Sequence, residues 1–360
     1  MKPTKKITLQ TKHKAYGASA VSMKEIQNES VSLVVTSPPY PMIDMWDESF
    51  RMQLVDIDVE DERRINKTFD DMHRILTDVW IESFRVLSPG GFLCINIGDA
   101  TRTINGAFRL FSNHSRVLND CLSIGFHNLP NIIWRKQTNA PNKFMGSGML
   151  PGGAYITLEH EYILIFRKPG KRLFTDKTLR RESAYFWEER NTWFSDVWDF
   201  KGTNQSINGN SSRERTGAFP IELPHRLINM FSLRGDTILD PFLGTGTTVL
   251  AAMLNGRNSI GYDVDPSFLD VLDSRLNGSF ITEANLVTSN RIKEHCQFIE
   301  DYLSRGKQPK HVNVKYDFNV ITNQETELKL FKISSIIRES NYKYLVAYTE
   351  SDVIEQPLFF

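Results

Sequence analysis

The sequence predicts an α/β protein built on a mainly parallel sheet, and three observations support this prediction. Short apolar runs that end in turn residues recur along the chain, separated by segments with helical periodicity, as in strands buried on both faces of a parallel sheet. Residues 237–263 read as strand, glycine-rich turn, helix and second strand, the order of a nucleoside-binding unit. At 360 residues, 40% hydrophobic and 11% aromatic, the chain can bury a sizeable core in one large domain with appendages or in two domains.

The expected strands share an apolar run closed by a turn residue. They are residues 32–36, 91–98, 131–136, 161–168, 237–240 and 258–263. Between the first two, apolar residues spaced for one helical face predict a helix that stops at the Pro-Gly-Gly of 89–91. After residue 280, a helix-like stretch at 289–306 precedes strand-like runs at 327–333 and 343–349, which predicts an α+β extension.

Overall charge does not indicate a class of partner, since 43 basic residues balance 43 acidic ones. Residues 167–182 depart from this balance, with seven Lys or Arg against two acids. Such a charge run fits either a solvated face or a nucleic-acid contact, and both interpretations stay open at this point.

The cysteines and the apolar pattern indicate a cellular compartment. Cys94, Cys121 and Cys296 are scattered and form no C-x-x-C pair, which argues against a disulfide framework or a metal site. The basic N-terminus lacks the apolar core of a signal peptide, and nowhere do about 18 apolar residues run together. We therefore expect a soluble cytoplasmic protein without a membrane partner.

The stretch DPFLGTGTT (240–248) has the features of a ligand-binding glycine loop. Gly244 and Gly246 allow backbone N–H groups to approach a ligand closely, and Thr247 and Thr248 suit the start of a helix, whose N-terminus favours an anionic group. Asp263, at the end of the next strand, is placed to accept hydrogen bonds from ribose hydroxyls. The unit predicts a nucleoside-cofactor site, with a plain tight turn as the alternative.

The absence of two motif residues limits which class of cofactor the glycine loop can bind. No Lys follows Gly246, as a P-loop requires, and Val249 stands where a dinucleotide fingerprint has its third glycine. Without a pyrophosphate clamp, the anion is better explained as a small carboxylate, such as that of the methionyl part of S-adenosyl-L-methionine.

The strand at 32–36 ends in Ser37, Pro38, Pro39 and Tyr40, which we call the diproline corner. Proline fixes its own φ and keeps the preceding residue extended, so this corner is a stiff ledge at the edge where open α/β sheets bind ligands. The Pro38 carbonyl and the Ser37 hydroxyl offer two acceptors for the two hydrogens of an exocyclic –NH2, and Tyr40 offers a ring on which a base can stack. Accepting both hydrogens favours a pyramidal nitrogen whose lone pair can meet an electrophilic methyl group; a simple Pro-Pro strand cap is the alternative.

Together, TSPPY and DPFLGTGTT resemble the S-adenosylmethionine-dependent DNA amino-methyltransferases, in particular the N4-cytosine enzymes of bacterial restriction–modification systems. The resemblance covers roughly residues 14–275, and the catalytic motif precedes the cofactor motif, as in the β-class. It implies a Rossmann-like seven-stranded sheet, circularly permuted and with one antiparallel strand, and a restriction endonuclease as functional partner.

The resemblance also carries site residues over. By position in the family motifs, the cofactor contacts are Asp240, Pro241, Phe242, Gly244, Gly246, Thr247, Thr248 and Asp263 together with Phe219, Pro220 and Leu223. Ala18 stands where the family usually has an acid, which removes one expected contact to the adenine end of the cofactor. Asp99 ends the strand after the catalytic one and is either a base-ring contact or a surface acid.

The resemblance divides the chain into four parts: a catalytic half (1–168), a target-recognition region (169–216), a cofactor-binding half (217–280) and an extension of unassigned role (281–360). A target base inside duplex DNA must be flipped into a pocket, so the basic segment becomes a DNA contact, in which Lys171, Arg172, Arg180 and Arg181 bind phosphates. The three tryptophans after it are expected to form a small core of their own.

Three functions remain after this comparison of motifs. Ser rather than Asp before Pro-Pro-Tyr favours methylation of cytosine N4 over adenine N6. Methylation of cytosine C5 requires a nucleophilic Cys, typically after Pro, and the chain has no Pro-Cys dipeptide. An inactive nucleic-acid-binding relative is the third alternative, against which the intact TSPPY and FLGTG motifs argue. The recognition sequence and oligomeric state cannot be read from the chain.

Overall fold

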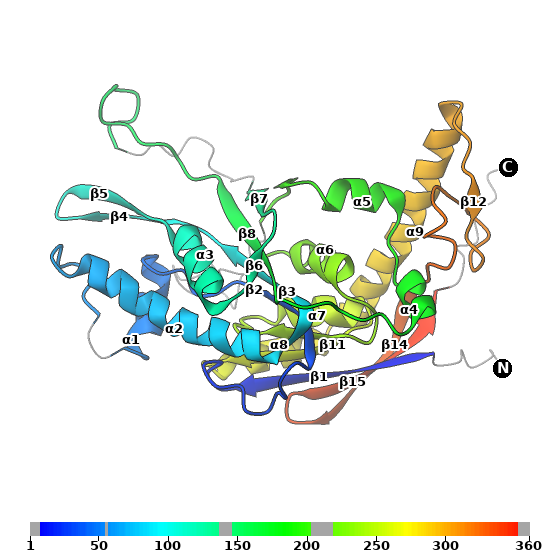
Figure 1. Cartoon of the computed structure of the whole chain (residues 1–360), viewed down its shortest axis with the longest axis horizontal. Coiled ribbons are helices and arrows are strands. Elements are labelled where there is room, and N and C mark those ends of the chain that lie inside the picture. Colours follow the sequence, from blue (N-terminus) through cyan, green and yellow to red (C-terminus); the bar gives the residue numbers. More distant parts are fainter. Residues whose placement is uncertain (1–7, 55–56, 137–145, 203–218, 352–360) are drawn as a thin grey trace.

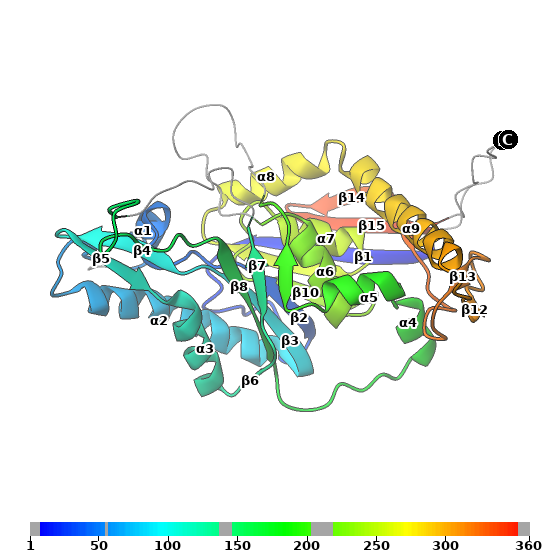
Figure 2. The same ribbon diagram turned by 90° about the horizontal axis from the view of Figure 1, so that it is seen from above.

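A single large sheet with helices on both faces organises the molecule (Figures 1 and 2). The computed structural model describes residues 8–54, 57–136, 146–202 and 219–351. The strands of the sheet are β1 (Leu9–Gly17), β2 (Val31–Thr36), β3 (Leu87–Ile97), β6 (His127–Asn128), β7 (Ile132–Arg135), β8 (His160–Arg167), β9 (Val197–Asp199), β10 (Thr237–Asp240), β11 (Asn258–Asp263), β14 (Phe331–Ser340) and β15 (Lys343–Glu350). Two small hairpins lie outside it, β4 (Ala100–Ile104) with β5 (Ala107–Phe111), and β12 (His311–Val312) with β13 (Asn319–Val320).

The helices connect these strands. They are α1 (Asp47–Arg51), α2 (Ile65–Val86), α3 (Asn113–Ile124), α4 (Lys177–Glu182), α5 (Trp187–Trp193), α6 (Glu222–Phe231), α7 (Thr247–Leu254), α8 (Ser267–Leu276) and α9 (Phe280–Ser304), with a short 3-10 turn, η1 (Asp44–Trp46). None of the helices in the described part of the chain is both long and apolar enough to cross a bilayer.

The central strands run in the order β1-β11-β10-β2-β3-β8-β7. Neighbours from β1 to β3 are parallel, whereas β8 is antiparallel to both β3 and β7. This arrangement confirms the predicted Rossmann-like sheet with one reversed strand, and each of the six predicted strands is present. β2, which carries the diproline corner, precedes β10 in the chain and lies beside it in the sheet.

Alternate residues of the strands feed two separate cores, because successive side chains point to opposite faces. On one face, Val34 and Leu93 pack against α2 and α3. On the other, Leu33 and Val35 pack against α6 and α7. Both faces are therefore covered, which explains why the strands read as continuous apolar runs rather than as alternating ones.

The Pro-Gly-Gly stretch does not lie between helix and strand, as predicted, but inside β3, which begins at Leu87. The register slips there, from Val31 opposite Leu87 to Leu33 opposite Phe92. Gly90 has a φ of +77°, and a Cβ on it would come within 2.6 Å of the backbone nitrogen of Arg172. The prolyl ring and the glycine thus form an irregularity within the strand instead of a loop before it.

The C-terminal extension has the predicted α+β content but is continuous with the sheet. β15 pairs antiparallel with both β1 and β14, and so adds two strands beyond the edge at β1. Tyr348 on β15 is fully buried, and its Oη donates to the Met253 carbonyl of α7 at 2.7 Å. Strand β1, which was not predicted, lies between this extension and β11.

The segment after β8 also differs from the expected separate lobe. β9 pairs with β7 and extends the sheet. Trp198 is 1% exposed and packs in the core beneath α6, and Trp193 lies edge-on to His225 of α6, whereas Trp187 is exposed. Two of the three tryptophans therefore pack into the main domain. Residues 203–216 of the expected recognition region lie outside the described residues.

Candidate active site

The structure brings the diproline corner and the glycine loop (241–246) together at the carboxyl ends of two neighbouring strands. β2 and β10 are adjacent and parallel, with Leu33 opposite Ile238. At their ends, Thr36 Oγ1 donates to Asp240 Oδ1 at 2.7 Å. Asp263 lies at the end of β11, on the other side of β10. Two motifs that stand far apart in the sequence thus form one edge, as predicted.

Asp240 fixes the start of the glycine loop through hydrogen bonds that its side chain accepts. Its side chain is buried, and Oδ1 also accepts the backbone N–H of Phe242 at 3.1 Å. Burial raises the pKa of this carboxyl from 3.8 to about 6, against the opposing effect of these hydrogen bonds. The predicted role of Asp240 as a cofactor contact is thus accompanied by a structural one, the joining of the two motifs.

Asp240 is expected to lower the stability of the protein as the pH rises from about 4 to about 7. In this window the unfolded chain has released the proton that the folded chain keeps until about pH 6, so ionisation works against folding. The rise in the pKa of Asp240 corresponds to a loss of about 3 kcal/mol in the free energy of unfolding, and this loss is complete above pH 6. Asp240→Asn can retain both accepted hydrogen bonds and should remove this loss.

Urea denaturation of wild type and Asp240→Asn at pH values across this window measures the effect. The difference in unfolding free energy, variant minus wild type, should increase by about 3 kcal/mol between pH 4 and pH 7. A difference that stays constant with pH would contradict the assignment.

The glycine loop turns through two left-handed residues. Gly244 has a φ of +49° and Gly246 a φ of +80°, and α7 begins directly after Gly246. Asp263 Oδ2 accepts the Gly244 N–H at 2.8 Å, so this N–H is used within the protein. Among the described residues, a Cβ on Gly244 would meet only the Phe242 carbonyl oxygen, at 3.9 Å, so they leave room for a ligand over the loop. Burial raises the pKa of Asp263.

The helix start beside the loop is also held from within. Thr248 Oγ1 donates to the Val35 carbonyl of β2 at 3.3 Å, and Arg275 Nη1 donates to the Thr245 carbonyl at 2.7 Å. Thr247 and Thr248 are both buried. They therefore position the N-terminus of α7 against the end of β2.

The diproline corner is buried more deeply than expected. Ser37 is half-buried, and Tyr40 is 8% exposed with its ring in the core beside α2. The face of the Tyr40 ring is thus not open for a base to stack on in this structure, because the ring fills the space next to Gly98. Its hydroxyl lies 3.0 Å from Ser37 Oγ and donates to Glu161 Oε2 at 2.9 Å.

Sequence analysis missed three polar residues that surround this hydroxyl. Asn96 on β3 and Glu161 on β8 contact Tyr40 Oη, and Lys136 contacts Glu161. An acid beside a run of buried apolar residues, as in EYILIF, was the available signal. Locating it required knowing that β8 runs antiparallel, which places the start of β8 at the end of β3.

Residues 219–223, which lead into α6, pack against the strand that carries the diproline corner. Phe219 and Leu223 are buried in the core that also contains Leu33 and Val35 of β2. Pro220, which is half-buried, accepts the Leu223 N–H at 3.1 Å. The structure therefore places these predicted cofactor residues beneath β2, with Pro220 the more accessible of the three.

Asp99 is neither free nor a surface acid. Its oxygens lie 2.8 Å from His114 Nδ1, and Oδ1 accepts the His114 N–H at 3.1 Å, at the start of α3. The His114 ring stacks on Tyr162 with 3.9 Å between centroids. Asp99 is at the carboxyl edge as predicted, but it is engaged in holding α3.

The basic segment lies at the opposite edge of the sheet. Because β8 is antiparallel, its end, Arg167, pairs with Phe92 near the beginning of β3. Arg172 then donates to Asp236, just before β10, at 2.7 and 2.8 Å. Of the other predicted phosphate contacts, Arg181 pairs with Glu327, Arg180 lies over the Phe174 ring, and Lys171 is exposed. The structure does not bring these four residues to the diproline corner.

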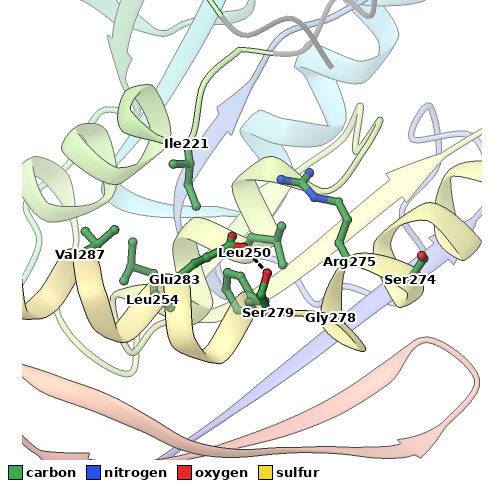
Figure 3. A pocket seen from close by; sticks show the side chains of 11 residues that line it. Ile221, Leu250, Leu254, Ser274, Arg275, Gly278, Ser279, Glu283 and Val287 are labelled. Atoms are coloured by element: carbon green, nitrogen blue, oxygen red, sulfur yellow. Dashed lines mark hydrogen bonds between the residues drawn. The ribbon is translucent and has the colours of Figure 1, made fainter. Parts of the chain in front are cut away.

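A cavity of about 490 Å³ lies between α7, the end of α8 and the start of α9, beside Ile221 and Arg275 (Figure 3). Its lining is mainly apolar and includes Leu250, Leu254 and Val287, while Ser279 donates to Glu283 at its rim. None of the corner or loop residues lines it.

The chain is similar to known DNA methyltransferases. The family model for N6 and N4 methyltransferases, described as DNA methylase, matches residues 31–274. The type II methyltransferase M.MthZI of Methanothermobacter thermautotrophicus is 47% identical over 351 residues, which cover 95% of this chain and 96% of that protein. M.MjaI of Methanocaldococcus jannaschii, also a type II methyltransferase, is 52% identical over 283 residues, or 75% of this chain and 93% of that protein.

A solved structure agrees with the sheet described above. The putative DNA modification methylase TTHA0409 of Thermus thermophilus, crystallised with S-adenosyl-L-methionine, matches with a TM-score of 0.58 at 32% identity, over 76% of this chain and 95% of that one. The family match spans more than half of this chain and includes both the corner and the loop. This chain therefore belongs to the N6/N4 DNA methylase family and is a DNA methyltransferase.

Proposed function

We propose that the chain is a site-specific methyltransferase that transfers a methyl group to the exocyclic N4 of cytosine in duplex DNA. S-adenosyl-L-methionine is the cofactor, as in the structure of the relative from Thermus thermophilus. The observation that carries the proposal is Ser37 at the end of β2, next to the glycine loop after β10, where the Ser-Pro-Pro-Tyr motif meets the cofactor motif. The type II relatives support a role in protecting cytoplasmic DNA from a partner restriction endonuclease.

The residues at the edge of the sheet fit this cofactor. The open space over Gly244 admits a ligand to the backbone of the loop. Asp263 keeps acceptor capacity for the ribose hydroxyls, since each carboxylate oxygen has more than one lone-pair site. The N-terminus of α7 favours the methionyl carboxylate. When bound, the cofactor supplies the electrophilic methyl group.

In the proposed mechanism the target cytosine is flipped out of the duplex into the space above the corner. The Ser37 hydroxyl and the Pro38 carbonyl accept the two hydrogens of the amine, so that its lone pair points toward the methyl group. One N–C bond would form as the S–C bond of the bound cofactor breaks and its sulfonium becomes a neutral thioether, and the methylated amine would release one proton to solvent. The contribution of the protein is positioning and exclusion of water, without a covalent intermediate.

The alternative target is adenine N6, whose exocyclic amine has the same two hydrogens. Ser37 in place of the Asp that is usual for adenine enzymes supports cytosine. An inactive DNA-binding relative is the remaining alternative, and Ala18 is the one departure that favours it.

Incubation of the protein with DNA and isotopically labelled S-adenosyl-L-methionine, followed by digestion to nucleosides, tests the proposal. N4-methylcytosine is the expected product. N6-methyladenine would replace the proposed target by the alternative. Cofactor binding without any labelled nucleoside, on DNA of a genome that lacks the modification, would favour the inactive relative.

A further inference from the structure

We propose that Glu161 is a positioning residue that sets the direction of the hydrogen bonds in the diproline corner, so that the Ser37 hydroxyl presents only lone pairs to the target amine. The inference rests on the proposed role of Ser37 as an acceptor. It concerns three residues outside the two sequence motifs: Asn96 on β3, Glu161 on β8 and Lys136 directly after β7.

The polar cluster consists of Ser37, Tyr40, Asn96, Lys136 and Glu161. Glu161 Oε2 accepts from Tyr40 Oη at 2.9 Å and from Asn96 Nδ2 at 2.6 Å, and Lys136 Nζ contacts Oε1. Tyr40 Oη lies 2.8 Å from Asn96 Nδ2 and 3.0 Å from Ser37 Oγ. Every oxygen and nitrogen of this chain of contacts is therefore within hydrogen-bond distance of the next.

The carboxylate determines which way each hydrogen points. Glu161 can only accept, so the Asn96 amide must turn its NH2 group toward it, and the Tyr40 hydroxyl must donate its one hydrogen to it. The second Asn96 hydrogen then goes to Tyr40 Oη. The oxygen of Tyr40 has no hydrogen left, so Ser37 must be the donor in the contact between the two hydroxyls. Asn96 Nδ2 also lies 3.5 Å from Ser37 Oγ, but its two hydrogens serve the closer acceptors at 2.6 and 2.8 Å, so the lone pairs of Ser37 Oγ remain available to the target amine.

Two further observations support this order. Asn96 is 2% exposed, and its Oδ1 has no partner among the described residues, although a buried unpaired acceptor is costly. The Asn96 side chain thus places its NH2 group on hydrogen-bond acceptors and leaves its own oxygen without a partner among the described residues, as the proposed direction of the hydrogen bonds requires. Burial and the Glu161 charge also raise the pKa of Tyr40 far above its usual value, so its hydroxyl keeps its hydrogen.

The backbone keeps the cluster close. A Cβ on Gly98 would lie 2.9 Å from Tyr40 Cε2 and 3.3 Å from Glu161 Cγ, so glycine allows both side chains to approach the end of β3. Trp134 lies opposite Glu161 in the sheet, and Lys136 Nζ sits 4.7 Å from the centre of its ring. The ammonium group contacts Oε1 and leaves Oε2 to Tyr40 and Asn96.

Glu161→Gln tests the inference, because an amide beside Lys136 turns its oxygen to the ammonium group and its NH2 toward Tyr40. The new NH2 group would then face the NH2 of Asn96 and the hydroxyl of Tyr40, which are themselves donors. Tyr40 would have to turn its hydrogen toward Ser37, and the Ser37 hydroxyl could then point its own hydrogen at the target amine. The single-turnover rate of methyl transfer should fall by about 10-fold or more, the scale seen when residues that support metal ligands are changed. The dissociation constants for S-adenosyl-L-methionine and for DNA should stay within about 2-fold of wild type.

A double variant separates ordering from a merely structural role. In Lys136→Met with Glu161→Gln, no ammonium attracts the amide oxygen, which can turn to Tyr40 and Asn96 and restore the order. We expect this double variant to be faster than Glu161→Gln alone, although it carries one more substitution. In a Tyr40→Phe background, Glu161→Gln should cause little further loss, because both changes break the same chain.

The inference is overturned if Glu161→Gln transfers methyl groups at the wild-type rate, or if the double variant is slower than the single one. Thermal unfolding and cofactor binding of each variant exclude a misfolded site as the cause. Failure of the proposed function is separate, since it would appear in the wild-type protein as a different methylated nucleoside or as none.

Discussion

Replacement of Ser37 by alanine is expected to slow methyl transfer by about 100-fold or more without changing the fold. Ser37 is half-buried at the end of β2, and its hydroxyl is one of the two acceptors proposed for the target amine. Loss of one well-placed polar group that acts in the transition state typically costs a factor of about 100 to 1,000. The lost rate should appear in kcat rather than in the affinity for DNA or cofactor.

Single-turnover transfer of a labelled methyl group to DNA measures this effect. Ser32→Ala is the matched control, since Ser32 lies on the same strand but toward its other end, away from the corner. It should keep the rate within about 2-fold. A Ser37→Ala protein that transfers methyl groups as fast as wild type would remove the serine from the mechanism.

Gly246→Ala is expected to abolish tight cofactor binding and to destabilise the protein by about 2–4 kcal/mol. A side chain in this left-handed conformation costs about 1–2 kcal/mol by itself. In addition, the new Cβ would lie 2.6 Å from Leu272 Cδ1, which forces either the loop or α8 to move. A displaced loop loses its backbone geometry, and each 1.4 kcal/mol lost from binding weakens affinity about tenfold.

Gly235→Ala provides the control for conformation alone. Gly235 has a φ of +77°, close to that of Gly246, but a Cβ there meets no atom of the described residues within 4 Å. We expect it to lose about 1–2 kcal/mol of stability and to bind the cofactor normally. Urea denaturation and calorimetric titration with S-adenosyl-L-methionine distinguish the two. Equal affinities for the two variants would show that the glycine loop does not hold the cofactor.

Sequence reasoning located the parts of the fold whose signals are local. The runs that became β2, β3, β7, β8, β10 and β11 are apolar and closed by turn residues, so each was predicted within a few residues. β1 was missed because LQTKHKAYG is mostly polar, with Thr11 and His13 at two of its buried positions, and it owes its place to partners on both sides, β11 and β15. Its strand character depends on pairing over hundreds of residues, which local propensity does not report.

The site shows the same division between local and distant information. The two motifs could be placed at one edge because the ends of parallel strands meet there. The edge at which the basic segment lies could not be predicted, because it depends on the direction of β8, which pairing with β3 decides. The same strand direction brings Glu161 to Tyr40, and no periodicity in the sequence records that contact. Strand direction was therefore the missing quantity in both cases.

The position of β1 between β11 and β15 has a consequence for how the polypeptide matures during synthesis. Its neighbours are made from residues 258–263 and 343–350, so β1 leaves the ribosome long before either partner strand has been made. Contacts of such long separation form slowly. A nascent chain that has not yet reached β15 should therefore expose one edge of β1, and an unpaired strand edge favours aggregation.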